Sequence, residues 1–269
     1  MTRISTLALV TLLIVAVAAV LGPVIWTLDP SATDPAHGLA GPSGAHPFGT
    51  DELGRDVFSR LMHGAQVTLL VGVASMLAAL VVGALVGAVA GFYGGWLDAL
   101  LMRLTDAMLA VPAFFLILVV VTVVGSNVTT LVLVIGGLSW MPVARVVYGE
   151  TLRWKIAEFV QAAESLGATP ARILARHVLP QTVPSLVVAA TLGVAYAILT
   201  ESAISYLGLG IQPPTPSWGN MLQRAQQYVF TAPSLALYPG VAITVVVLAF
   251  NFLGDGLRDA FDPRAQRRR

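Results

Sequence analysis

A polar stretch between residues 156 and 180 contains the residues whose types and spacing are most informative. It lies between two apolar runs that are each long enough to cross a bilayer, so it has to face water and can meet a partner there. The residues that we select for this contact are Gln161, Ala162, Ala163, Glu164, Gly167, Arg172, Leu179 and Pro180. The chemistry that they offer is the recognition of another protein.

Two apolar stripes predict that this stretch folds as two short amphipathic helices. The first stripe has the spacing of one helical face and consists of Ile156, Phe159, Val160, Ala163, Leu166 and Gly167. The second consists of Pro170, Ile173, Leu174, His177 and Val178. We expect both stripes to rest on the ends of membrane helices, while the opposite faces stay available to the partner.

Four residues predict where the two helices end and begin. Gly167 is expected to end the first helix, because glycine accepts a left-handed backbone without steric cost. Thr169 is the expected N-cap of the second helix, and Pro170 is expected at its first position. Pro180 is expected to end the second helix. The result is a bent hairpin.

Titratable residues elsewhere give weaker signals. Glu201 is expected near the outer end of a membrane span, where a carboxylate is a functional candidate by default. His37, His46 and His63 are all expected on the outer side, but their spacing is irregular and we predict no metal site. The sequence has no Gly-x-Ser-x-Gly and no His-Glu-x-x-His, so we predict no catalytic residues.

The composition indicates a membrane protein. Hydrophobic residues make up 57% of the 269 residues and charged residues only 11%, against about 25% charged residues in a soluble domain. Much of the surface is therefore expected to face lipid. The net charge of +1 gives no field that would attract nucleic acid. The absence of cysteine excludes disulfides, thiolate metal sites and cysteine nucleophiles.

Uncharged runs predict an all-α, polytopic protein with six transmembrane helices. The first run, 7–27, starts like a signal peptide, but it reaches spanning length and we expect it to be retained. The second lies within 66–97. The run 107–144 is too long for one crossing, and Gly125-Ser126-Asn127 predicts a turn that divides it into the third and fourth spans. The fifth and sixth are 181–200 and 235–254.

The distribution of Lys and Arg predicts the orientation. Twelve of the 15 basic residues fall in segments on the side of the N-terminus, whereas Arg55, Arg60 and Arg224 fall on the other side. Both termini and the 145–180 loop are therefore expected in the cytoplasm. The predicted parts are an N-terminal helix with an external segment (1–65), a core that contains the cytoplasmic loop (66–258) and a basic cytoplasmic tail (259–269).

Small residues and prolines within the spans predict features of helix packing. Gly83, Gly87 and Gly91 recur every four residues, so they share a face on which another helix can approach closely. That helix belongs either to this chain, which we favour, or to a second subunit. Pro112 and Pro142 are expected to kink the third and fourth spans.

The hairpin resembles the EAA loop of importer-type ABC permeases. That pattern is Glu-Ala-Ala, three residues, Gly, nine residues, a hydrophobic residue, any residue and Leu-Pro. Every interval is correct in this chain, which gives Gln161-Ala162-Ala163, Gly167, His177 and Leu179-Pro180. Gln161 replaces the glutamate and His177 the hydrophobic residue, and an Arg-His-Val-Leu-Pro ending is typical of the peptide and nickel branch.

Other segments strengthen the resemblance to that branch. Residues 46–60 are similar to its first external segment, and its C-terminal half is matched by Ser205-Tyr206-Leu207-Gly208-Leu209-Gly210, Pro213-Pro214, Trp218-Gly219 and residues 250–259. The match covers most of residues 46–264. The chain most resembles the C-type permease subunit of dipeptide permeases.

The resemblance implies the partners and the mechanism. The chain would pair with a homologous B-type permease to form the pathway, and two ATPase subunits, separate or fused, would dock on the EAA loops. An extracytoplasmic binding protein would deliver the substrate, in the cytoplasmic (inner) membrane of a bacterium. The selected residues from Gln161 to Pro180 would couple ATP hydrolysis to transport, and Glu201 becomes a candidate for the pathway.

The sequence supports handling of ATP by other subunits. It has no Gly-x-x-x-x-Gly-Lys-Ser/Thr phosphate cradle, and its only lysine, Lys155, is not in a glycine-rich loop. We therefore expect no cofactor on this chain, with ATP and Mg²⁺ held by the ATPase partners, and no enzymatic activity of its own. Peptides are the expected cargo, and nickel chelates, opines or glutathione are alternatives. An ion-coupled carrier is the alternative from another class, although its spans would need buried carboxylates.

Four charged residues in the external segment have two interpretations. Asp51, Glu52, Arg55 and Asp56 could form an external gate or contact the binding protein. They could instead hold the segment in shape through Asp–Arg pairs, which contribute about 0–1 kcal/mol each when exposed to water. We favour the second interpretation.

Overall fold

Long helices that run in nearly the same direction form most of the molecule. The computed structural model describes residues 3–261. Its long helices are α1 (Arg3–Ile25), α2 (Val57–Tyr93), α6 (Trp140–Lys155), α9 (Leu179–Tyr206) and α11 (Ser234–Phe261). Shorter helices connect them: α3 (Gly95–Leu109), α4 (Ala113–Val124), α5 (Val128–Gly137), α7 (Glu158–Ser165), α8 (Pro170–Ile173) and α10 (Trp218–Ala225). The predicted all-α class is confirmed.

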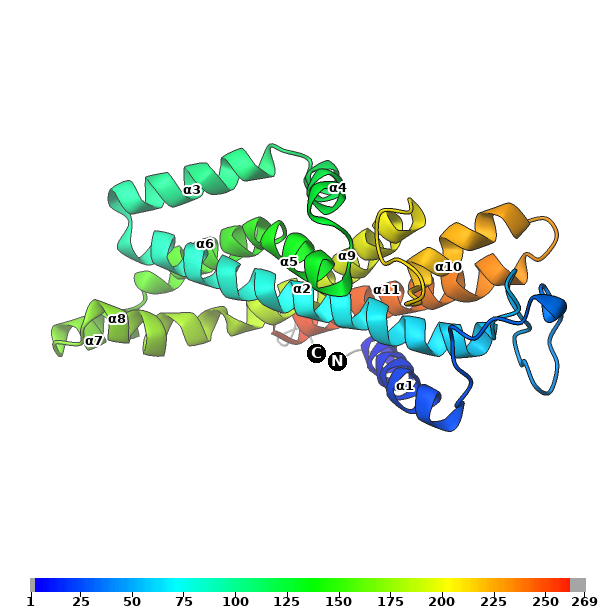
Figure 1. The fold of residues 1–269 in the computed structure, drawn as a ribbon. Coiled ribbons are helices and arrows are strands. Elements are labelled where there is room, and N and C mark those ends of the chain that lie inside the picture. Colours follow the sequence, from blue (N-terminus) through cyan, green and yellow to red (C-terminus); the bar gives the residue numbers. More distant parts are fainter. Residues whose placement is uncertain (1–2, 262–269) are drawn as a thin grey trace.

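The bundle is built around α2, which packs against α5, α6 and α9, while α11 packs against α9 and α1. Figure 1 shows the connection α7–α8 at one end of the bundle, and α10 with the segment that follows α1 at the other end. The start of α1 lies against the end of α11, because Ser5 packs directly on Gly256. The two ends of the described chain are therefore on the same side of the bundle.

Within residues 3–261, five helical segments are long and apolar enough to cross a membrane, and the pair α3 and α4 makes a sixth if it is counted as one span. This agrees with the predicted six spans. The third span differs from the prediction, because it begins at Gly95 and bends by 82° between α3 and α4. Asp98, Arg103 and Asp106, the charged residues between the second and third uncharged runs, lie on α3. Pro112 is the residue before α4, so the predicted kink is a complete break.

The turn between the third and fourth spans lies where the sequence predicted it. Gly125 has a φ of 96°, and the Asn127 side chain accepts a hydrogen bond from the Thr130 N–H at 2.8 Å, which caps α5. Pro142 lies in the first turn of α6, where a proline removes no helical hydrogen bond. The α5–α6 segment counts as a single span, so the structure gives Pro142 no sharp kink.

The prediction that Pro180 ends a helix is wrong. Residues 170–206 form one helical segment in which a π-helical turn, Leu174–Val178, joins α8 to α9. Pro180 is the second residue of α9 and directly follows the π-helical turn, where the α-helical hydrogen-bond pattern is already interrupted. The fifth span is therefore continuous with the second half of the hairpin and longer than predicted.

The predicted glycine face packs within this chain. Gly83, Gly87 and Gly91 lie against α6, where Cβ atoms would contact Trp140, Ala144 and Thr151, among others. This confirms the interpretation that we favoured. Of the predicted basic tail 259–269, the first three residues continue α11, and residues 262–269 lie outside the described residues.

Candidate functional site

The hairpin α7–α8 has the predicted bend. Gly167 follows α7 with a φ of 81°, a left-handed conformation that residues other than glycine adopt at a cost. Its N–H donates to the Glu164 carbonyl at 2.9 Å, and the Ala168 N–H donates to the Ala163 carbonyl at 3.1 Å. Thr169 occupies the N-cap position, although its side chain makes no cap hydrogen bond, and Pro170 is the first residue of α8.

The first apolar stripe is less buried than predicted. Val160 is buried and Ala163 is half-buried, but Ile156, Phe159 and Leu166 are 73%, 41% and 88% exposed. The reason is geometric: α7 lies at the extreme end of the bundle, so only one side of this short helix has a neighbour (Figure 1). The tip of the hairpin therefore presents large apolar side chains with nothing covering them.

The second stripe is buried largely as predicted. Ile173, Leu174 and Val178 pack into the core, although Pro170 is exposed. Among the remaining candidates, Gln161, Ala162, Glu164, Gly167, Arg172 and Pro180 are exposed, and Leu179 is half-buried. The hairpin is thus fixed through α8 and offers the face of α7 to a partner.

One anchor of the hairpin was missed at the level of sequence. Glu150, near the end of α6, accepts hydrogen bonds from the Ser185 hydroxyl of α9 at 2.8 Å and from the Trp154 Nε1–H at 3.1 Å. It joins the two helices that carry the hairpin. A glutamate and a serine 35 residues apart give no spacing signal that would have identified them.

Asp51, Arg55 and Asp56, which the sequence predicts on the outer side, are buried rather than exposed to water. Asp51 accepts a hydrogen bond from Arg55 Nε at 2.7 Å and lies 3.4 Å from Arg60 Nε, and all three side chains are buried. Removing one partner of a buried ion pair leaves the other charge unpaired in the interior, which costs far more folding free energy than the loss of an exposed pair. The low value expected for exposed pairs therefore does not apply here.

Glu52 connects two parts of the chain that are far apart in sequence. Its Oε1 accepts hydrogen bonds from Arg55 at 3.2 Å and from Arg224 of α10 at 3.1 Å. The sequence did not predict this pairing of Arg224, which it placed only among the basic residues on the outer side. Together these contacts tie the segment between α1 and α2 to α10.

Asp56 caps α2. Its Oδ1 accepts hydrogen bonds from the Ser59 N–H at 2.6 Å and from Trp26 Nε1 at 3.1 Å, and its Oδ2 lies 2.8 Å from His46 Nδ1. His37 is instead bonded to Asp34, and His63 to the Ser59 carbonyl. Across residues 3–261, no group of three His, Asp or Glu side chains could hold a metal ion.

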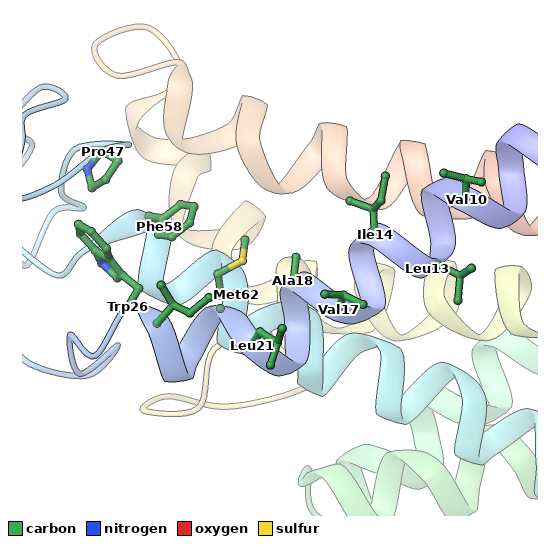
Figure 2. Close-up of a pocket in the computed structure, with 12 residues that line it drawn as sticks. Val10, Leu13, Ile14, Val17, Ala18, Leu21, Trp26, Pro47, Phe58 and Met62 are labelled. Atoms are coloured by element: carbon green, nitrogen blue, oxygen red, sulfur yellow. The ribbon is translucent and has the colours of Figure 1, made fainter.

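A groove of about 690 Å³ follows α1 on its side toward α2 (Figure 2). Val10, Leu13, Ile14 and Val17 line it along the helix, and Trp26, Pro47 and Phe58 lie at its outer end. The lining is almost entirely hydrocarbon. Such a surface suits lipid or another helix and offers little to the charged ends of a peptide.

Glu201 is completely buried in α9. Its carboxylate accepts hydrogen bonds from the hydroxyls of Ser205 at 2.7 Å and Thr68 at 3.2 Å. The structure therefore does not place this pathway candidate on an exposed surface. Through Thr68, Glu201 instead connects α9 to α2.

A bundle of membrane-spanning helices with a projecting hairpin defines a multi-pass membrane protein. The chain belongs to the family described as the inner membrane component of binding-protein-dependent transport systems, which it matches over residues 83–267. It is a permease subunit of an ABC importer, and such permeases work with ATPase and substrate-binding partners.

Relatives agree with this assignment. The chain is 47% identical over 224 residues to the glutathione transport system permease protein GsiD of Escherichia coli O157:H7, with 83% of this chain and 74% of the relative covered. The same figures hold for that protein from Shigella sonnei (strain Ss046). Among solved structures, an inward-facing conformation of the MetNI methionine ABC transporter matches with a TM-score of 0.60 and 21% identity, over 75% of this chain and 95% of that chain. This last likeness concerns the fold.

Proposed function

We propose that the chain forms half of the translocation pathway of an importer for short peptides. The resemblance of residues 46–60 and of the C-terminal half to dipeptide permeases supports a peptide cargo. Glutathione, which the names of the relatives specify, is itself a small peptide with a γ-linked glutamate. The two cargoes share an amide backbone and charged ends, so both fall within the proposed class. Nickel chelates and opines are the remaining alternatives.

The hairpin is the proposed site of ATPase coupling, and its uncovered tip is the observation that carries this part. Ile156, Phe159 and Leu166 expose large apolar surfaces at the end of the bundle. Such a cluster, surrounded by polar residues, is typical of a protein interaction site. ATP and Mg²⁺ would be bound by the ATPase subunit whose groove receives this tip.

The partner in the membrane is proposed to be a homologous B-type permease, which would supply the other half of the pathway. The external segment would meet the binding protein. Because Asp51, Arg55 and Asp56 are buried, their proposed role is to hold that segment in the shape that the binding protein recognises. A direct contact is left to Glu52, which is the most exposed of the four.

The proposed orientation has both termini and the hairpin in the cytoplasm. The Lys and Arg bias supports it, as does the packing of Ser5 against Gly256, which places both chain ends on one side. Because the chain lacks cysteine, Leu166→Cys and Phe230→Cys can each be labelled alone in intact cells. A membrane-impermeant thiol reagent should label the Phe230→Cys variant without permeabilisation and the Leu166→Cys variant only after it. The reverse pattern would invert the topology.

Uptake by reconstituted vesicles tests the function. The chain, its B-type partner and the ATPases are inserted in vesicles, and the binding protein is added outside with a labelled dipeptide, a longer peptide or glutathione. Uptake should require ATP and the binding protein and persist when ion gradients are collapsed. Uptake that follows an ion gradient without ATP would overturn the proposal, and saturating competition by glutathione alone would restrict the cargo.

A further inference from the structure

Glu201 lies where α9, α2 and the start of α10 meet, and it has no exposed surface. Its Oε1 accepts a hydrogen bond from Ser205, and its Oε2 accepts bonds from Thr68 at 3.2 Å and from Ser202 at 3.4 Å. A buried carboxylate is costly to the fold unless such donors surround it. The position of this side chain is therefore closely specified by its neighbours.

The hydroxyls that bind Glu201 also hold the loop 207–217 and the start of α10. Ser205 Oγ accepts a hydrogen bond from the Ile211 N–H at 3.1 Å, and Thr68 Oγ1 accepts one from the Trp218 N–H at 3.3 Å. Ser217, the N-cap of α10, is buried directly before Trp218. One carboxylate thus joins the loop 207–217 and the start of α10 to α2 and α9.

Close packing holds the loop 207–217 and the start of α10 in place against α9. A Cβ atom on Gly210 would lie 2.1 Å from Ser205 Oγ, and one on Gly219 would lie 2.7 Å from the Ser202 carbonyl oxygen. Trp218 is buried beside them, and its Nε1–H donates to the Leu61 carbonyl at 3.0 Å. Densely packed contacts of this kind transmit displacement rather than absorb it.

The helix that carries Glu201 also carries half of the hairpin. Residues 170–206 form one helical segment, so Glu201 lies about 45 Å along the helix from Pro170, at a rise of about 1.5 Å per residue. Leu174–Val178 is a π-helical turn and Pro184 lies inside α9, but the chain between Pro170 and Glu201 remains one unbroken helical segment. A displacement of α8 at the inner end therefore reaches the level of Glu201.

We infer that Glu201 is a positioning residue that transmits movement of the hairpin to the loop 207–217 and α10. When the ATPases move α8, α9 moves with it, and the hydroxyl cluster around Glu201 carries the loop 207–217 and α10 along. Without the hydrogen bonds to Glu201, the junction of α9, α2 and α10 loosens, and less of the movement of α9 reaches the loop 207–217 and α10. This inference rests on the coupling function proposed for the hairpin.

Two pairs of spin labels in the assembled transporter test the two steps separately. The native chain has no cysteine, so Gln66→Cys with Gln227→Cys reports the outer end, and Trp96→Cys with Ser165→Cys reports the hairpin. All four positions are exposed. Distances are measured by pulsed EPR in nanodiscs with the binding protein present, before and after trapping with ATP and vanadate. Both pairs should change distance in the parent.

The variants Glu201→Ala and Glu201→Gln then separate transmission from folding. In Glu201→Ala the inner pair should still change, the outer pair should change much less, and uptake should fall about tenfold or more, because several hydrogen bonds to one buried side chain are lost. Glu201→Gln should restore much of the outer change, since an amide oxygen still accepts from the hydroxyls. Thr200→Val is the matched control, because Thr200 is buried next to Glu201 but bonds only to the Tyr196 carbonyl within its own helix.

The outcomes distinguish this inference from the proposed function. An outer change in Glu201→Ala equal to that of the parent would overturn the inference, even with the hairpin working as proposed. An inner pair that does not respond in the parent would instead refute the coupling function. If Glu201→Ala fails to assemble, Ser205→Ala and Thr68→Val each remove one link, and an undiminished outer change in both would equally overturn it.

Discussion

Gly87 of α2 and Ala144 of α6 are in such close contact that a Cβ atom on Gly87 would lie 2.3 Å from the Ala144 carbonyl oxygen. The obstacle is backbone, which cannot move aside as a flexible side chain could. Gly83 and Gly91 extend this contact by one turn in each direction. Through it α6, which leads into the hairpin, is held against the central helix α2.

Gly87→Ala is expected to loosen this contact. Overpacking in a tight interface costs about 1–3 kcal/mol, so the thermal midpoint of the purified permease should fall. Gly149→Ala is the control on α6, because a Cβ there meets nothing within 4 Å. It should leave the midpoint unchanged or raise it slightly, since alanine favours helix. An equal midpoint for both variants would contradict the packing described here.

Gly167→Val is expected to uncouple ATP hydrolysis from uptake. A Cβ at this position meets nothing within 4 Å, so the obstacle is the φ of 81° rather than space. A left-handed backbone costs a residue other than glycine about 1–2 kcal/mol, and a β-branched residue tolerates it least. The number of substrate molecules taken up per ATP should fall. Gly167→Asn should retain most coupling, and equal losses in the two variants would refute the conformational explanation.

Leu166→Asp is expected to weaken docking of the ATPase without affecting the fold. Leu166 is 88% exposed, so its replacement removes no internal packing. A charge in the socket of the partner should reduce retention of the ATPase about tenfold, as loss of an apolar anchor does. Phe230→Asp at the opposite end of the bundle, where Phe230 is 98% exposed, should leave retention intact. Co-purification measured against ATPase concentration gives the answer, and undiminished retention would remove the hairpin tip from the interface.

Asp51→Ala is expected to destabilise the external segment. It leaves Arg55 and Arg60 buried without their shared carboxylate, and breaking a buried pair in this way costs about 3–5 kcal/mol. Glu52→Ala should cost less, because Glu52 is more exposed. Thermal midpoints test this order. If Asp51→Ala kept its stability but lost stimulation by the binding protein, Asp51 would belong to a gate or docking surface instead.

Local sequence patterns were sufficient for much of the fold and for the centre of the hairpin. The apolar runs identified the membrane helices because each must satisfy its backbone internally and cover itself with apolar side chains. Gly125 and Gly167 marked turns because both adopt a positive φ. Their positions depend on neighbours in sequence, so no knowledge of distant contacts was needed.

Long-range contacts set the rest. Pro180 failed as a helix end because a π-helical turn just before it lets the chain continue into α9. The extent of exposure at Ile156 and Leu166 depends on how far α7 projects from the bundle, which no stripe of residues encodes.

The sequence by itself determined that this chain is a helical membrane protein, with most of its spans, its turns and its bent hairpin, because hydrophobic length and backbone preference are local properties; its motifs indicated an importer permease. Only the tertiary structure decided that the external charges are buried and that Glu52 pairs with Arg224, 172 residues away. It alone placed Glu201 beside Thr68. Which polar groups satisfy one another in a low-dielectric interior is settled by helix packing, and the packing brings together residues whose separation along the chain carries no signal.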